Sequence, residues 1–141
     1  MRIIIDAMGG DNAPQAACQG AIDALRKDPE LLITLAGPVD QITPHLDAAG
    51  DVRSRLSVLD TPEVIDNHES PAMAIRQKKK SAIVTGMLAL RAGDTDAFVS
   101  AGSTGAVLVG GMLRLGRIPG IERPALAPLI AILWAKHRSF H

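Results

Sequence analysis

The sequence predicts an α/β fold, with a doubly wound, mostly parallel sheet and helices on both faces in three αβα layers. Short apolar segments alternate with segments of helical character along the 141 residues, as in consecutive β-α-β units. The first apolar segment, 2–6, has no polar alternation, which is typical of a strand covered on both faces. Glycine-rich turns at 6–14 and 100–106 each separate a strand-like segment from a helix-like one.

The remaining elements follow from periodicity and from glycine and proline positions. The segment 60–71 has two prolines, a dense polar run and no periodicity, so we expect a loop near the mouth of a site. Asn12 and Ser70 are the expected N-caps of the helices that follow them. We expect strands at 2–6, 31–36, 56–59, 97–100 and 125–133, and helices at 15–27, 39–48, 71–76, 81–91 and 104–115.

Composition excludes several classes of protein. Fifteen Lys and Arg balance 15 Asp and Glu, so the whole molecule lacks the positive charge of a nucleic-acid-binding protein. The single cysteine, Cys18, excludes an intramolecular disulfide framework and a multi-cysteine zinc site, and we expect it to be a buried core thiol. No apolar stretch reaches the ~18 residues of a membrane span. Because a strand is expected already at 2–6, we expect no signal peptide and a cytoplasmic protein.

The two glycine-rich turns predict a site that handles phosphate or an acyl group. In an open α/β fold, ligands bind at the carboxyl ends of the strands, where both turns are expected. The amides of Gly102 to Gly105 at a helix start can hold a phosphate or an oxyanion, and the Ser103 and Thr104 hydroxyls add donors. The alternative is that these glycines only form a tight strand–helix turn.

Asp6 and Asp11 bracket the first turn. A carboxylate repels a neighbouring phosphate unless the carboxyl group carries a proton, binds a metal or accepts hydrogen bonds. Asp6, at a strand end, is the better catalytic candidate, whereas capping is the alternative role for Asp11 and Asn12. A magnesium site built on both carboxylates would need further ligands, and the sequence shows no ligand set of recognisable spacing. We therefore expect no metal.

Two further groups are candidates. His68 is the histidine of the 60–71 loop and could shuttle a proton, although simple solvent exposure is the alternative. Arg76 and Lys78 to Lys80 form a basic cluster that could hold phosphate or dock an acidic carrier protein. The alternative for this cluster is a solvated helix face.

Four segments resemble the bacterial phosphate acyltransferases of phospholipid synthesis: DAMGGDNAP at 6–14, RQKKKS at 76–81, SAGSTGA at 100–106 and GRIPGIERPA at 116–125. The similarity runs from residue 1 to about 129, which we take as the N-terminal part of the α/β acyltransferase domain. Ser103 stands where we expect Asn more often in that family. Members of the family are more than twice as long, so we expect the fold to be truncated, and the tail 130–141 is atypical of the family.

The resemblance implies transfer of a fatty acyl group from acyl carrier protein to inorganic phosphate, giving acyl phosphate without a covalent enzyme intermediate or a cofactor. It also implies a homodimeric full-length form and loose, peripheral membrane attachment. Asp6 and His68 are the expected catalytic residues. The expected phosphate and oxyanion ligands are Gly9, Gly10, Asp11, Asn12, Arg76, Lys79, Ser100, Gly102, Ser103, Thr104 and Gly105.

Two alternatives stay open at this stage. One is a non-catalytic fragment of such an enzyme that at most binds phosphate. The other is a nucleotide-binding α/β enzyme, such as a dehydrogenase or kinase. Against the second, the chain has neither a G-x-x-x-x-G-K-[ST] loop nor a G-x-G-x-x-G fingerprint.

Overall fold

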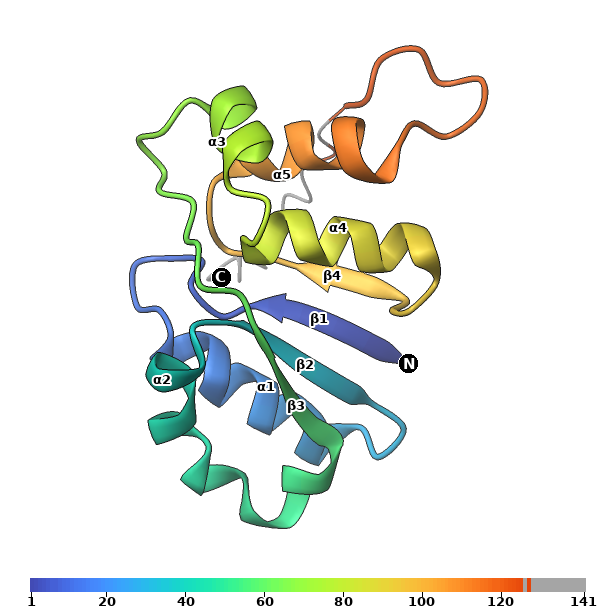
Figure 1. The fold of residues 1–141 in the computed structure, drawn as a ribbon. Helices are drawn as coiled ribbons and strands as arrows, with labels where there is room; N and C mark the ends of the chain where they lie inside the picture. The colour runs from blue at the N-terminus through green and yellow to red at the C-terminus, as the bar shows by residue number, and fades with distance from the viewer. Residues whose placement is uncertain (126, 128–141) are drawn as a thin grey trace, which may run out of the picture.

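The computed structural model describes residues 1–125 and 127. Its centre is a parallel sheet of four strands in the order β3-β2-β1-β4 (Figure 1). The strands are β1 (Arg2–Asp6), β2 (Leu32–Gly37), β3 (Leu56–Asp60) and β4 (Ala97–Val99). These four agree with the predicted strands to within one residue at each end. The expected strand over 125–133 and the tail 130–141 lie outside the described residues, apart from positions 125 and 127.

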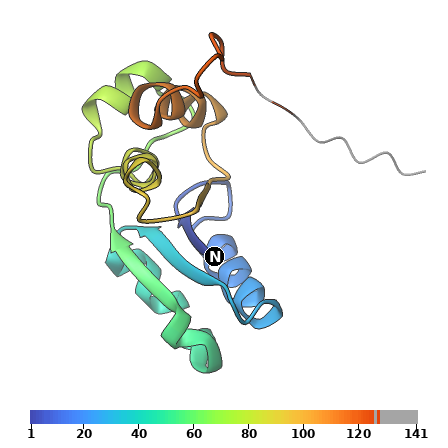
Figure 2. The same cartoon turned by 90° about the vertical axis from the view of Figure 1, so that its right-hand side faces the viewer.

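Helices cover both faces of the sheet, which confirms the doubly wound architecture (Figures 1 and 2). One face carries α1 (Gln15–Lys27), α2 (Val39–Ile42) and two 3-10 segments, Thr43–His45 and Asp47–Arg55. The other face carries α4 (Ala82–Ala92). A further layer lies outside α4. It consists of α3 (Pro71–Gln77), α5 (Thr104–Gly110) and a π-helical turn, Gly111–Leu115, each of which contacts α4 or another member of the layer.

The pleat of β1 divides its isoleucines between the two layers. Ile3 and Ile5 pack against the cluster that contains Cys18, whereas Ile4 packs with Ala82 of α4. Successive side chains of a strand point to opposite faces, so a strand buried on both faces must be apolar throughout. Cys18 is 1% exposed, as expected of a core thiol, and burial raises its pKa.

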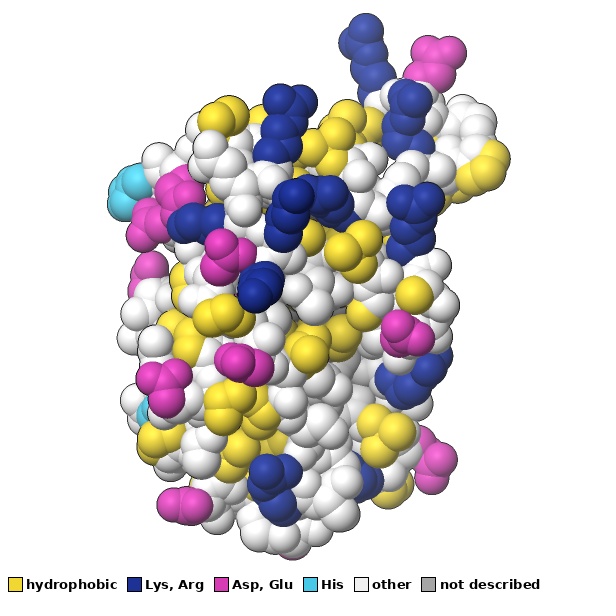
Figure 3. Space-filling view, viewed as in Figure 1, with side chains coloured by type: hydrophobic (Ala, Val, Ile, Leu, Met, Phe, Trp, Pro, Cys, Tyr) yellow, Lys and Arg dark blue, Asp and Glu magenta, His cyan; other side chains and the backbone are white. Residues whose placement is uncertain are grey.

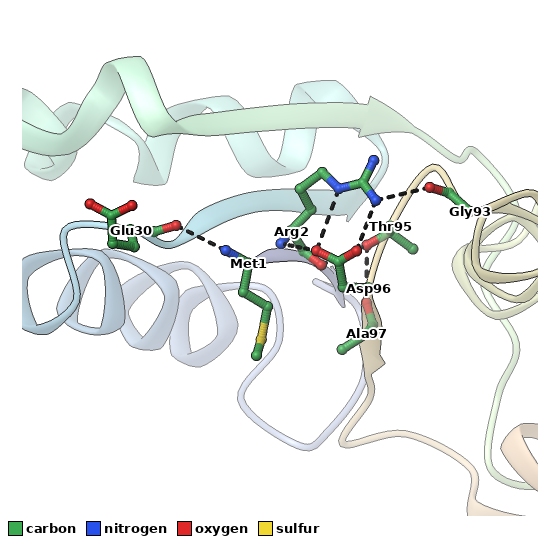
Figure 4. Close-up of polar contacts among 7 residues, drawn as sticks. All are labelled: Met1, Arg2, Glu30, Gly93, Thr95, Asp96 and Ala97. Atoms are coloured by element: carbon green, nitrogen blue, oxygen red, sulfur yellow. Dashed lines mark hydrogen bonds and ion pairs between the residues drawn. The ribbon is translucent and has the colours of Figure 1, made fainter.

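The amino ends of β1 and β4 are joined by an ion pair (Figure 4). The Arg2 guanidinium lies 2.8 Å from an Asp96 carboxylate oxygen, and the Arg2 amide donates to the same carboxylate at 2.7 Å. Hydrogen bonds from Arg2 are the main reason that the pKa of Asp96 falls to about 2. Arg2 also donates to the Gly93 carbonyl at 2.9 Å. These contacts fix the strand register at the end opposite the glycine turns.

Several local expectations were wrong, and others were confirmed. Helix α1 has the predicted bounds, but Pro14 is its N-cap residue and Asn12 makes no side-chain cap. Ser70 precedes α3 without a side-chain cap bond. The expected helix 39–48 is replaced by a single turn of α-helix and the 3-10 segments, which continue to Arg55. The expected helix 104–115 ends its α-helical part at Gly110.

The structure decides that α3 and α4 are separate helices. The chain breaks between Gln77 and Ala82, and Ser81 caps α4 by accepting from the Val84 amide at 3.4 Å. Helix α4 ends at Gly93, whose φ of 79° places it in the left-handed region. The loop expected over 60–71 is confirmed up to Ser70. Among the described residues, no helix has the length and hydrophobicity needed to traverse a bilayer.

Candidate functional site

The two glycine-rich turns touch each other. Strands β1 and β4 are parallel neighbours, so their carboxyl ends, and the turns that follow, lie at the same edge of the sheet. A Cβ atom placed on Gly9 would lie 2.7 Å from the Gly102 amide nitrogen and 3.1 Å from Asp6 Oδ2. Only a residue without a side chain permits this approach. The contact brings together residues that are more than 90 positions apart in the sequence.

Asp6 lies buried between the turns, with only 7% of its surface exposed. Its Oδ1 accepts a hydrogen bond from the Met8 amide at 3.1 Å, and its Oδ2 accepts one from the Ser100 hydroxyl at 2.8 Å. Burial raises the pKa of Asp6 above its ordinary value of 3.8, and these hydrogen bonds oppose the shift without cancelling it. Asp6 is therefore a carboxyl group that takes up a proton more readily than an exposed aspartate.

Ser100 connects Asp6 with the second turn. While its hydroxyl donates to Asp6, its oxygen accepts a hydrogen bond from the Gly102 amide at 3.1 Å. The Gly102 amide, which we expected to face a phosphate, is thus occupied within the protein. The side chain of Ser100 is part of the framework that holds the two turns together.

The start of α5 leaves backbone amides for a ligand. Ser103 is the N-cap residue, and its hydroxyl accepts from the Ala106 amide at 3.2 Å, so this hydroxyl is used in capping. The amides of Thr104 and Gly105 have no partner inside the helix. A Cβ on Gly105 would lie 2.8 Å from Pro71 Cγ, which places the first turns of α5 and α3 against each other.

Two hollows adjoin the turns. An open groove of about 390 Å³ is lined by both turns, Val99 of β4 and the small residues Ala16, Ala17 and Gly20 of α1. A second, small cavity of about 10 Å³ also borders Asp6, which is about the least space that can hold one water molecule. Asp6 lines both hollows.

Comparisons with known proteins identify the family of this chain. The family model described as fatty acid synthesis protein matches residues 1–136. The chain belongs to this family. Relatives named phosphate acyltransferase include one from Shouchella clausii, 45% identical over 130 residues, and one from Clostridium beijerinckii, 46% identical over 130 residues. The matches cover 92% of this chain but only 38% and 39% of these two relatives, so the chain spans about two fifths of their length.

The fold is also similar to that of a solved structure. A phosphotransacetylase from Streptococcus pyogenes superposes with a TM-score of 0.59 at 18% identity, over 87% of this chain and 40% of that one. At this identity the likeness supports the α/β fold alone. It agrees with the parallel sheet and the helices on both faces.

His68 lines neither of the two hollows beside Asp6. His68 is exposed, and its backbone amide donates to Asp66 Oδ1 at 2.8 Å. Glu63, Val64 and Ile65 of the same loop line the 10 Å³ cavity beside Asp6 instead. Glu63, which lines this cavity, was not singled out from the sequence. Its only signal was its position just after a strand, in the loop already expected at the site mouth.

The basic cluster divides into one structural lysine and several exposed cations. Lys78 Nζ donates to the Val64 carbonyl at 2.6 Å and pairs with Glu69, which fastens the loop to the end of α3. Arg76 and Lys79 are exposed, and within residues 1–125 and 127 neither side chain bonds to the glycine turns. Figure 3 shows Lys and Arg gathered over the part of the molecule that carries α3, α4 and α5.

Asp11 and Asn12 are exposed beside the groove. The Asn12 carbonyl accepts a hydrogen bond from the Ala16 amide at 2.9 Å, so Asn12 supports the start of α1 through its backbone. Capping by either side chain, the alternative role considered for them, is therefore wrong. No group of three or more His, Cys, Asp or Glu residues in the described part of the chain could hold a metal ion.

The contact between the turns can be tested by Gly9→Ala. The added Cβ meets the backbone of Gly102 at 2.7 Å, and a backbone atom cannot move aside by changing rotamer. We expect a loss of about 1–3 kcal/mol in the free energy of unfolding, as for overpacked sites. The matched control is Gly20→Ala, since a Cβ there meets nothing within 4 Å and alanine in a helix is favoured by ~0.5–1 kcal/mol. Equal denaturation midpoints for the two variants would refute the close approach.

Proposed function

We propose that this chain provides the phosphate-binding turns and the acid–base carboxyl group of an enzyme that transfers a fatty acyl group from acyl carrier protein to inorganic phosphate. The product would be acyl phosphate for phospholipid synthesis. The observation that carries the proposal is the contact between the two glycine turns around the buried Asp6. The names of the relatives, phosphate acyltransferase, support the same reaction.

The reaction needs a cradle for phosphate, an oxyanion hole for the tetrahedral intermediate, and a general acid or base. A phosphate oxygen attacks the thioester carbonyl, the carbon–sulfur bond breaks, and the thiol leaves with a proton. The amides of Thr104 and Gly105 and the Thr104 hydroxyl would hold the phosphate, together with the amides of Gly10 to Asn12. One well-aimed donor to the developing oxyanion contributes roughly 3 kcal/mol, or about a hundredfold in rate.

Asp6 would act as the acid–base group, because burial raises its pKa toward the range in which a carboxyl group can both accept and return a proton. His68, exposed on the neighbouring loop, would exchange protons with solvent. Arg76 and Lys79 would attract an acidic carrier protein by local charge. A cytoplasmic location, a homodimeric full-length form and peripheral membrane attachment complete the proposal.

Binding of phosphate can be tested without turnover. Titrating the 141-residue chain with inorganic phosphate should shift the amide resonances of Thr104, Gly105 and Gly10 to Asn12. Thr104→Val keeps the side-chain shape but removes the hydroxyl, so it should weaken binding roughly tenfold, as for the loss of a hydrogen bond to a charged group. NAD in place of phosphate tests the nucleotide-binding alternative. Shifts confined to Lys79 and Lys80, or a response to NAD alone, would contradict the proposed site.

A further inference from the structure

The hydrogen bonds of Ser100 determine what its hydroxyl can do next. A serine hydroxyl has one proton to donate and two lone pairs to accept with. The proton goes to Asp6 Oδ2 at 2.8 Å, and one lone pair accepts from the Gly102 amide at 3.1 Å. One lone pair remains. In this arrangement Ser100 cannot donate a hydrogen bond to a phosphate oxygen, as the sequence had led us to expect, but it can accept a proton from one.

Exposure points in the same direction. Asp6 lines the groove, but only 7% of its surface is exposed, so little of the carboxylate is open to a ligand there. Ser100 is only partly buried and follows β4 directly at the site edge. The Ser100 hydroxyl is bonded both to the buried carboxylate and to the Gly102 amide of the second turn. A proton accepted by Ser100 can therefore be passed to Asp6 across one hydrogen bond.

We propose that Ser100 relays a proton from the attacking phosphate to Asp6, a role that rests on the proposed function. As the phosphate oxygen forms its bond to the acyl carbon, its proton passes to Ser100 Oγ, and the Ser100 proton passes to Asp6 Oδ2. Asp6 becomes neutral and the serine hydroxyl is restored. When the carbon–sulfur bond has broken, the same path in reverse delivers the proton to the thiolate of the carrier.

The surroundings of Asp6 favour its role as the proton acceptor. The other titratable side chains that line the two adjoining hollows are Glu63 and Asp11, both acidic, and no Lys, Arg or His of the described chain lines either one. No cation therefore holds Asp6 in its charged form there. The hydrogen bonds from Ser100 and Met8 are the main interactions that stabilise the carboxylate. The carboxylate can therefore accept a proton that arrives through Ser100.

The first test is a pH titration of the 141-residue chain by NMR, which needs no turnover. In the unsubstituted chain, the Gly102 amide should titrate with the same midpoint as the Asp6 carboxyl, because Ser100 joins them. In Ser100→Ala, the pKa of Asp6 should rise further and the Gly102 amide should lose this dependence. Ser100→Thr, which keeps a hydroxyl, should restore both, and Ser54→Ala, at an exposed serine, should change neither. A Gly102 amide that ignores the Asp6 titration in the unsubstituted chain would overturn the relay, even if Ser100→Ala does not fold.

The second test separates a relay from a phosphate ligand. It uses the chain joined to the C-terminal portion of the Shouchella clausii relative. Loss of a proton path should lower kcat about a hundredfold in Ser100→Ala, within the usual range for acid–base groups, and leave the KM for phosphate nearly unchanged. A raised KM with an unaltered kcat would show that Ser100 binds phosphate and would overturn the relay. If the unsubstituted protein has no activity, the proposed function fails, while the NMR titration still decides the coupling.

Discussion

Replacing Asp6 with asparagine is expected to lower acyl transfer by about 10²–10⁴-fold, the usual contribution of a positioned acid–base group. Asparagine has nearly the same shape, and its oxygen can still accept from the Met8 amide, which lies 3.1 Å from Asp6 Oδ1. The fold should therefore survive, while the group that takes up the proton is lost. The measurement is thiol release from acyl carrier protein in the chain joined to the C-terminal portion of a relative.

The same substitution should stabilise the protein near neutral pH. Because the pKa of Asp6 is raised in the folded state above 3.8, the folded chain binds this proton more tightly than the unfolded chain. The stability contributed by Asp6 is therefore full below about pH 3.8 and is lost as the pH rises through the folded pKa. The difference between Asp6→Asn and the unsubstituted chain should grow over that range in denaturant titrations at successive pH values.

Asp11→Asn is the matched control, since Asp11 is exposed and caps no helix. Its effect on the free energy of unfolding should stay within about 0.5 kcal/mol, as for most surface changes, and its effect on transfer should be small. Similar, mild losses of activity in both variants would show that Asp6 has no special chemical role. A loss of stability in Asp6→Asn at pH 7 would contradict the raised pKa.

The 141-residue chain alone is expected to release thiol at least about a hundredfold more slowly than the same chain joined to the C-terminal portion of a relative. An oxyanion site works only when its donors are held in place and water is excluded. Here the groove beside the turns is open, and Val99 at the edge of β4 is 50% exposed. We therefore expect the open groove to bind phosphate but not to keep water from the thioester.

The assay is thiol release with the two proteins at equal concentration, with phosphate binding measured in both. Equal rates would show that these 141 residues suffice for catalysis.

Exposed apolar side chains predict in addition that the chain alone self-associates. They include Met112, Leu113, Ile118 and Ile121, each at least 43% exposed. A monomer with a sharp, two-state melting transition would contradict this expectation.

The sequence by itself determined the order and type of the elements. An unbroken apolar run predicted β1, Pro14 and Pro29 predicted α1 with its observed bounds, and glycine turns marked the strand ends. These signals are local, because burial on both faces and the 3.6-residue period act within one segment. They fail where a segment is short and polar. The 39–48 region therefore became one turn of α-helix followed by 3-10 segments. No local signal separated a cap at Asn12 from a start at Gln15.

Only the tertiary structure decided which residues form the site. Ser100 and Asp6 are 94 positions apart, and they meet because the sheet order places β4 beside β1. The sequence marked both as polar residues near glycines, but it could not tell a hydroxyl that faces a ligand from one that is bonded to a carboxylate. Lys78, one of four basic residues in its segment, likewise proved to hold the 60–71 loop through its bonds to Val64 and Glu69. Hydrogen-bond partners depend on distances between segments, and those distances are set by packing of the whole chain rather than by any local pattern.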